Sequence, residues 1–238
     1  MLERLSEAER RCALGVLESY SVILEPRLKE LIFQAWSQFL LRKPGVVWVA
    51  PLLKSGSRAP KSSQIIWATL RGHKEVLEKS GAHVHLLRSH KRHLAKRKPD
   101  DWLVLVDDYI GSGRTAAGVL TEVVQADPTR TSENVAVVAA VAQSMAADHL
   151  NGRCKLDVAL VRHRCLSDTQ LVGFLEQMRG LGRRLRFPEC EVLGYENTEA
   201  ALTLRRTPNN TLPMFWTNRR VGGAVWPAPF PRGNDRET

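Results

Sequence analysis

The chain has 238 residues, of which 43% are hydrophobic, and it carries a formal net charge of +10. This length is enough for one large domain or two small ones with a sizeable core. No apolar run approaches the ~20 residues of a membrane-spanning helix, and the opening MLERLSEAERR mixes charges of both signs, unlike a secretory signal. We therefore expect a soluble, cytoplasmic protein with no membrane partner, whose positive charge favours anions such as nucleic acid, nucleotides or pyrophosphate compounds.

The four cysteines, Cys12, Cys154, Cys165 and Cys190, are far apart in the sequence and form no CxxC pair. A chain of this size does not depend on disulfide bonds for its stability. We expect buried, reduced thiols and no zinc site.

Residues 1–43 are predicted to form an N-terminal helical extension. Apolar residues recur at helical spacing over residues 2–19 and again after Pro26. The pattern then changes to a continuous apolar run, Val46 to Leu53, which is typical of a strand buried on both faces.

Strands and helices alternate along the predicted domain, residues 44–226. Strands are expected at 84–87, at 102–106 and in NVAVVAAVA and LDVALVRH; helices are expected over SSQIIWATLRGH, TAAGVLTEVVQA, weakly ADHL, and residues 166–186. This alternation predicts an α/β fold with an open, mostly parallel sheet, helices on both faces and a C-terminal hood or tail. Residues 227–238, rich in proline and charge, are expected to be a disordered tail.

The stretch that carries chemistry is LVLVDDYIGSGRT, residues 103–115, in which a strand leads through an acidic pair to a glycine turn and a helix. Gly111 and Gly113 let the backbone N–H groups point toward one place, and the helix start adds its positive end, which suits a terminal phosphate. Asp107 and Asp108 would repel phosphate, so their partners are hydroxyl groups or a divalent cation. The stretch therefore predicts a sugar phosphate site, with Mg²⁺.

From Val104 to Thr115, VLVDDYIGSGRT resembles the phosphoribosyl pyrophosphate (PRPP) signature of the type I phosphoribosyltransferases. The resemblance implies that Asp107 and Asp108 hold the ribose hydroxyls, partly through Mg²⁺. It also implies that the turn wraps the 5-phosphate, with these residues: Gly111, Ser112, Gly113, Arg114 and Thr115. Enzymes that act on 6-oxopurines carry an aspartate at the position of Gly111, so the glycine argues against hypoxanthine or guanine as the base.

The resemblance also implies a pyrophosphate loop after an early strand, and APLLKSGSRAPKSS lies in that place. Lys54, Ser55 and Gly56 would offer an ammonium group, a hydroxyl and backbone donors to the leaving pyrophosphate. The alternative is an ordinary basic loop.

A second basic segment, RSHKRHLAKRKPDD, precedes the acidic-pair strand. Related enzymes have a flexible basic loop here that closes over the reaction centre, which would give Lys91, Arg92, Lys96 and Arg97 a role in neutralising pyrophosphate. A solvated run of charge and a contact with nucleic acid are equally open interpretations.

Near the C-terminus, TPNNTLPMFW resembles a signature of phosphoribosyltransferase-like proteins encoded in bacterial conflict systems, including retron cassettes. The resemblance implies a role in anti-phage defence. Phe215, Trp216 and Trp226 would either form a hood over the base or close one edge of a core.

Three functions remain open. The first is transfer of phosphoribosyl from PRPP, with Mg²⁺, to an unknown acceptor, in which Asp107, Asp108, Lys54, Lys91 and Arg92 act on the reacting groups. The second is a non-catalytic sensor of PRPP or nucleotides, and the third is a nucleic-acid-associated subunit of a nucleoprotein complex. The sequence leaves the oligomeric state open.

Overall fold

The fold is described from a computed structural model, for residues 1–54, 62–78, 81–90, 97–128 and 131–232. The chain divides into two compact units, one formed by Met1–Glu25 with Arg162–Thr238 and the other by Pro26–Val161. These limits differ from the domain limits expected after residues 43 and 226, because the first helix belongs with the C-terminal part of the chain. Each unit is described by itself.

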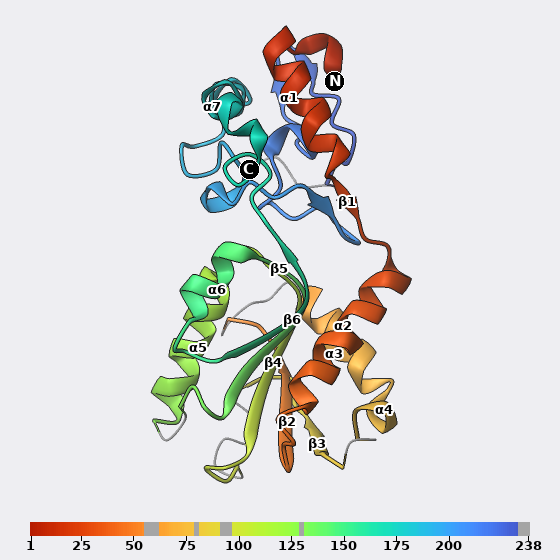
Figure 1. The fold of residues 1–238 in the computed structure, drawn as a ribbon, viewed down its shortest axis with the longest axis vertical. Helices are drawn as coiled ribbons and strands as arrows, with labels where there is room; N and C mark the ends of the chain where they lie inside the picture. The colour runs from red at the N-terminus through yellow and green to blue at the C-terminus, as the bar shows by residue number, and fades with distance from the viewer. Residues whose placement is uncertain (55–61, 79–80, 91–96, 129–130, 233–238) are drawn as a thin grey trace. The chain divides into compact units, whose positions relative to one another are not determined.

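The unit of residues 26–161 is built on a five-stranded sheet with the order β3–β2–β4–β5–β6 (Figure 1). The strands are β2 (Val46–Pro51), β3 (His83–Leu86), β4 (Trp102–Ile110), β5 (Val135–Gln143) and β6 (Lys155–Arg162). β2 pairs in parallel with β3 and with β4, and β4 pairs in parallel with β5. The predicted α/β class with a parallel sheet is confirmed.

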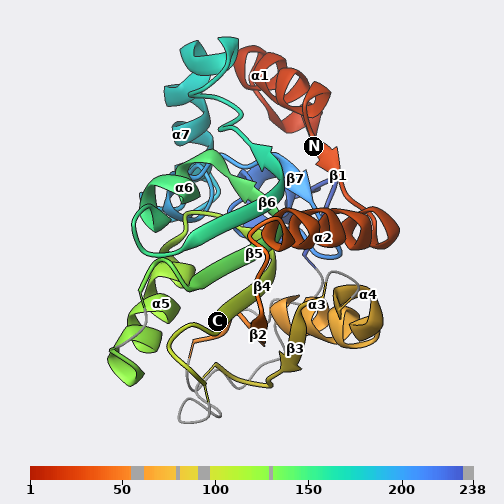
Figure 2. The ribbon, with the colours of Figure 1, turned by 60° about the horizontal axis from the view of Figure 1, so that its bottom comes forward.

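Helices cover both faces of this sheet. The views in Figures 1 and 2 place α2 (Glu25–Leu40), α3 (Ser62–Arg71) and α4 (Lys74–Glu78) on one face. The opposite face carries α5 (Arg114–Ala126) and α6 (Ser144–Leu150). Because the paired strands β3, β2, β4 and β5 run in parallel, their carboxyl ends meet along one edge, where ligands of such sheets bind.

The sheet forms where β-branched and small apolar residues run without interruption. All nine residues of β5 are buried, which is the pattern of a strand covered on both faces. A core on the α5 and α6 face joins alternate residues of β4 and β5, such as Leu105 and Val137, to Val119 and Leu120 of α5. Burial of this apolar surface holds the strand ends in fixed register.

The other unit packs α1 (Glu7–Glu18) against α7 (Leu175–Arg184) and the 3₁₀ helix η3 (Gln170–Phe174). Ser6 begins α1 with a capping box, in which its hydroxyl accepts from the Glu9 N–H and Glu9 accepts from the Ser6 N–H. A short parallel pair joins β1 (Ser21–Val22) to β7 (Leu202–Thr203). The remaining short elements are η1 (Leu2–Arg4), η4 (Tyr195–Asn197), η5 (Pro213–Phe215), β8 (Arg220–Val221) and β9 (Ala224–Val225).

The C-terminal aromatic residues belong to the core of this unit. Phe215 is fully buried and Trp226 nearly so, and the Trp226 indole donates to the Met214 carbonyl at 2.8 Å. Phe230 stacks on Tyr20 with ring centroids 4.4 Å apart. The structure shows that Phe215 and Trp226 pack in a core, which is one of the two predicted roles of these aromatics. Of the predicted tail, residues 227–238, the structure describes residues 227–232. Within the described ranges, no helix is both long and apolar enough to cross a bilayer.

Candidate functional site

The acidic pair lies inside β4, because this strand ends four residues later than predicted. The strand was expected to end at Val106, but it continues to Ile110. The extension pairs with β5, since Asp107 is opposite Ala139 and Ile110 is opposite Ala142. Ladder hydrogen bonds use backbone groups, so two polar side chains do not end a strand whose neighbour continues.

Asp107 is held by two nearby groups. Its Oδ1 accepts a hydrogen bond from the backbone N–H of Asp108 at 2.9 Å and one from the Ser62 hydroxyl at 3.4 Å. Asp108 is buried, whereas Asp107 keeps partial contact with solvent. Ser62 opens the segment SSQIIWATLRGH, for which the sequence predicts only a helix. Its contact with Asp107 brings the first turn of α3 to the acidic pair, and a pairing between such distant residues leaves no signal in a single sequence.

The Asp107 pKa is raised well above the ordinary aspartate value. Desolvation of its carboxyl group is the main cause, and the adjacent charge of Asp108 is the second. The raised pKa means that ionising the Asp107 carboxyl group beside Asp108 is unfavourable in the protein alone. A cation or a set of hydroxyl donors would relieve this repulsion.

A tight turn follows the strand, and Gly113 is its critical residue. Gly113 has φ +82°, in the left-handed region that favours glycine. A Cβ atom at this position would also lie 3.0 Å from the His149 Cβ and 3.2 Å from the Ala146 carbonyl oxygen. The turn therefore packs directly on α6, and both the conformation and the contact require glycine.

The first turn of α5 presents a positive end next to the turn. Gly113 is the N-cap residue, so no side chain caps the helix there, and the first turn contains no acidic residue. The Ser112 hydroxyl oxygen accepts from the Arg114 N–H at 3.4 Å. Arg114 and Thr115 are exposed. A helix start of this kind attracts an anion through its N–H groups and its dipole.

Lys54 lies beside the same helix. A Cβ atom added at Gly118 would be 3.1 Å from Lys54 Cε and 3.5 Å from Nζ. Gly118 is in the second turn of α5, so the structure brings the Lys54 ammonium group alongside the helix that begins at the glycine turn. The absence of a side chain at Gly118 leaves room for this approach.

Four of the predicted site residues lie outside the described residues: Ser55, Gly56, Lys91 and Arg92. Lys96 lies outside them too. Arg97, at the end of the basic segment, is buried and donates from its guanidinium to the His90 carbonyl at 3.2 Å. Arg97 thus has a structural contact within the described part of the chain.

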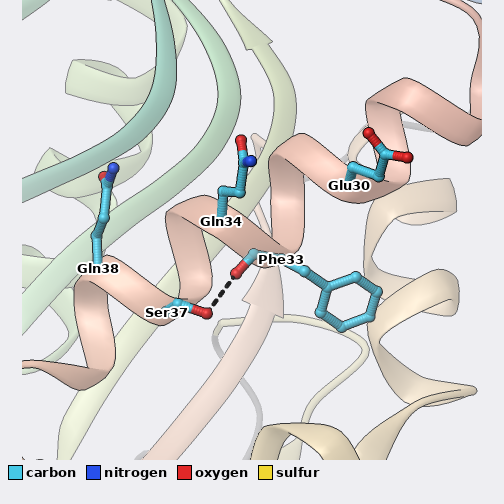
Figure 3. Close-up of a pocket in the computed structure, with 5 residues that line it drawn as sticks. All are labelled: Glu30, Phe33, Gln34, Ser37 and Gln38. Atoms are coloured by element: carbon cyan, nitrogen blue, oxygen red, sulfur yellow. Dashed lines mark hydrogen bonds between the residues drawn. The ribbon is translucent and has the colours of Figure 1, made fainter.

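A separate surface hollow lies along α2 and is lined by Glu30, Phe33, Gln34, Ser37 and Gln38 (Figure 3). The Ser37 hydroxyl donates to the Phe33 carbonyl at 2.9 Å, as the dashed line shows. Neither the acidic pair nor the glycine turn lines this hollow. It therefore contributes nothing to the site built on β4 and α5.

The residues that would meet a divalent cation are the two aspartates. Across the described ranges, no group of three or more His, Cys, Asp or Glu side chains could hold a metal ion. One or two carboxylates that share Mg²⁺ with substrate oxygens are the usual arrangement for a phosphate substrate. The donor set of Asp107 and Asp108 fits that arrangement.

A family model described as PRTase-CE matches residues 3–232. A comparison with curated proteins finds no match. The family match includes β4, the glycine turn and α5, and it also includes α1 and the C-terminal aromatic segment. The chain therefore belongs to the PRTase-CE family of phosphoribosyltransferase-like proteins.

Proposed function

We propose that the protein binds PRPP with Mg²⁺ and transfers the phosphoribosyl group to an acceptor. One observation carries the proposal: β4 presents Asp107 and Asp108 just before a left-handed Gly113 that opens α5. Carboxylates suit the ribose hydroxyls, and backbone donors at a helix start suit the 5-phosphate. The two halves of the site match opposite ends of one ligand.

The reaction is a displacement at the anomeric carbon. The bond from this carbon to pyrophosphate oxygen breaks, a bond to the acceptor forms, and the acceptor loses a proton. The transition state resembles an oxocarbenium ion, so the work of the protein is positional and electrostatic. Mg²⁺, when bound with PRPP at Asp107 and Asp108, supplies positive charge that stabilises the leaving pyrophosphate.

The residues of the chain divide this work between them. The turn from Gly111 to Thr115 fixes the phosphate end, and Asp107 and Asp108 orient the ribose. Lys54, beside α5, would contribute charge to the leaving pyrophosphate. Gly111 supplies no side chain for proton transfer, which disfavours a 6-oxopurine acceptor.

Calorimetric titration with PRPP, with and without Mg²⁺, tests the proposal. We expect Mg²⁺-dependent binding, and we expect loss of binding when Asp107→Asn is combined with Asp108→Asn. Asp100→Asn, an exposed carboxylate just before β4, is the matched control and should bind normally. Wild-type protein that binds no PRPP under either condition would falsify the proposal.

Release of pyrophosphate in the presence of PRPP and a panel of nucleobases separates an enzyme from a sensor. Gly111 favours the sensor as a second candidate, because it removes the side chain that enzymes acting on 6-oxopurines use for proton transfer. Binding of PRPP without pyrophosphate release from any mixture would assign the sensor function.

A role in anti-phage defence is the broader part of the proposal. It rests on the likeness of TPNNTLPMFW to proteins of bacterial conflict systems. Plaque counts on bacteria that carry the wild-type gene or the doubly substituted Asp107→Asn, Asp108→Asn gene test it. Equal plaque counts for both genes and for an empty vector would contradict a defence role that uses this site.

A further inference from the structure

One polar residue at the carboxyl end of β5, Gln143, has no role in the proposed function. β5 ends at Gln143, immediately after Ala142, which pairs with Ile110 of β4. Continuing this register places Gln143 opposite Gly111, where the glycine turn begins. The helix that follows, α6, contributes Ala146 and His149 to the wall against Gly113.

The Gln143 amide is buried and unsatisfied. The residue is 1% exposed, and in the described part of the chain neither its oxygen nor its nitrogen has a hydrogen-bond partner. Its side chain does not cap α6 either. An amide buried without partners is unfavourable relative to one that is hydrogen-bonded, because it has lost its bonds to water. Such a group is expected to have a partner that arrives with a ligand.

A second unsatisfied group lies near the acidic pair. The Ser63 hydroxyl is also 1% exposed and has no hydrogen-bond partner within the described residues. Ser63 follows Ser62, whose hydroxyl contacts Asp107. Unsatisfied polar groups therefore occur on α3 and at the end of β5, the elements next to the strand that carries the acidic pair.

The chemistry of the Gln143 amide limits what can satisfy it. An amide presents an acceptor oxygen and a donor nitrogen in one plane. Phosphate and pyrophosphate oxygens only accept, so they would leave the Gln143 oxygen unpaired. A planar edge that carries a donor next to an acceptor satisfies both atoms, as when glutamine pairs with a base edge.

We propose that Gln143 binds the phosphoribosyl acceptor, and that this acceptor presents a planar donor–acceptor edge, such as the lactam or amidine edge of a nucleobase or a carboxamide. This inference rests on the proposed function, because it concerns the acceptor in the same site. It assigns Gln143 to the selection of the acceptor and leaves the binding of the ribose phosphate to the residues of β4 and the glycine turn.

Calorimetric titrations of ribose 5-phosphate and of 5′-mononucleotides test the inference. The panel contains adenine, cytosine, uracil, hypoxanthine and nicotinamide mononucleotides. For each of them, the ratio of its Kd to the Kd of ribose 5-phosphate isolates the contribution of the base. For wild type we expect at least one mononucleotide to bind about tenfold more tightly than ribose 5-phosphate, as two hydrogen bonds in a desolvated site would give. In Gln143→Met this preference should disappear, while ribose 5-phosphate binds as in wild type.

Gln125→Met is the matched control, since Gln125 is exposed on α5, and it should keep the preference. Melting without ligand provides the second measurement. Methionine has a similar length and no polar group to satisfy, so Gln143→Met should melt at the wild-type temperature or above it. A fall of several degrees would show that the amide has a structural partner and would overturn the proposal.

The inference also fails if wild type binds no mononucleotide more tightly than ribose 5-phosphate, or if Gln143→Met keeps the preference. Failure of the proposed function has a different signature, because then ribose 5-phosphate and PRPP do not bind wild type at all. In that case mononucleotide binding that depends on Gln143 still supports the inference, and its absence overturns it.

Discussion

Lys54 and Gly118 lie so close that a methyl group added at Gly118 would meet Lys54 Cε at 3.1 Å and Nζ at 3.5 Å. A glycine in the interior of α5 is unfavourable for the helix, because glycine loses more backbone entropy than alanine. The contact gives this glycine a function: it leaves space for an ammonium group beside the helix that opens the phosphate turn.

The first prediction is that Gly118→Ala separates stability from binding. The free energy of unfolding should rise by about 0.5–1 kcal/mol, since alanine favours the helix and Lys54 is flexible enough to move. Displacement of the ammonium group should weaken pyrophosphate binding by about three- to tenfold, because it removes part of a charge-assisted contact. Urea unfolding and calorimetric titration with pyrophosphate measure the two effects.

Gly180→Ala is the control for this prediction. Gly180 lies inside α7, and a Cβ atom there would have no neighbour within 4 Å. The substitution should give the same gain in stability and leave pyrophosphate binding unchanged. If Gly118→Ala binds pyrophosphate as well as Gly180→Ala does, Lys54 takes no part in the site.

The second prediction concerns the glycine turn. Gly113→Ala should lower the free energy of unfolding by about 2–4 kcal/mol, since it adds a left-handed alanine and a short contact with α6. Gly152→Ala separates these causes, because Gly152 also has a positive φ, +70°, but has open space around its Cβ position. It should cost only about 1 kcal/mol. Equal losses in the two variants, measured by urea unfolding, would show that α6 does not support the turn.

The predictable part of this structure is the part that local patterns determine. The apolar run of β5 and the strand–turn–helix order around the acidic pair could be predicted, because each depends only on residues that are neighbours in the sequence. The extension of β4 to Ile110 was hidden because Asp107 and Asp108 look like the end of a strand, whereas backbone pairing with β5 decides where it ends.

Contacts between distant residues could not be predicted in the same way. The hydroxyl of Ser62 reaches Asp107 across 45 positions of the sequence. The unsatisfied amide of Gln143 is recognisable only when its burial and its surroundings are known. The packing of α1 against α7 likewise joins the two ends of the chain, and neither helix shows its partner in its own periodicity.

The third prediction is that Cys190 reacts alone in the folded protein. The prediction of buried thiols is correct for Cys12, Cys154 and Cys165 and wrong for Cys190, which is exposed. Burial raises the pKa of Cys12 to about 11 and that of Cys154 to about 12, so both remain protonated at neutral pH. A thiol reagent at pH 8 should modify one cysteine rapidly in wild type and none in Cys190→Ser. Rapid modification of a second thiol in the native protein would refute this assignment.

The last prediction follows from the raised pKa of Asp107. Between the unfolded aspartate pKa, about 3.9, and the higher folded value, the folded state binds more protons than the unfolded state. The stability of wild type should therefore fall as the pH rises through this window. Asp107→Asn keeps an oxygen to accept from the Asp108 N–H and removes the charge, so it should be more stable than wild type at pH 7–8, and this gain should vanish near pH 4.

Asp168→Asn provides a control of opposite sign. Hydrogen bonds and charge from Arg164 lower the Asp168 pKa, so its carboxylate contributes stability above the unfolded pKa that is lost as the pH falls through the folded one. Asp168→Asn should therefore be less stable than wild type at pH 7, and this deficit should shrink in acid. Melting temperatures between pH 4 and pH 8 measure both effects. If Asp107→Asn is instead less stable than wild type at pH 7, the protein stabilises the Asp107 carboxylate without a cation, and the electrostatic argument for Mg²⁺ at this pair is removed.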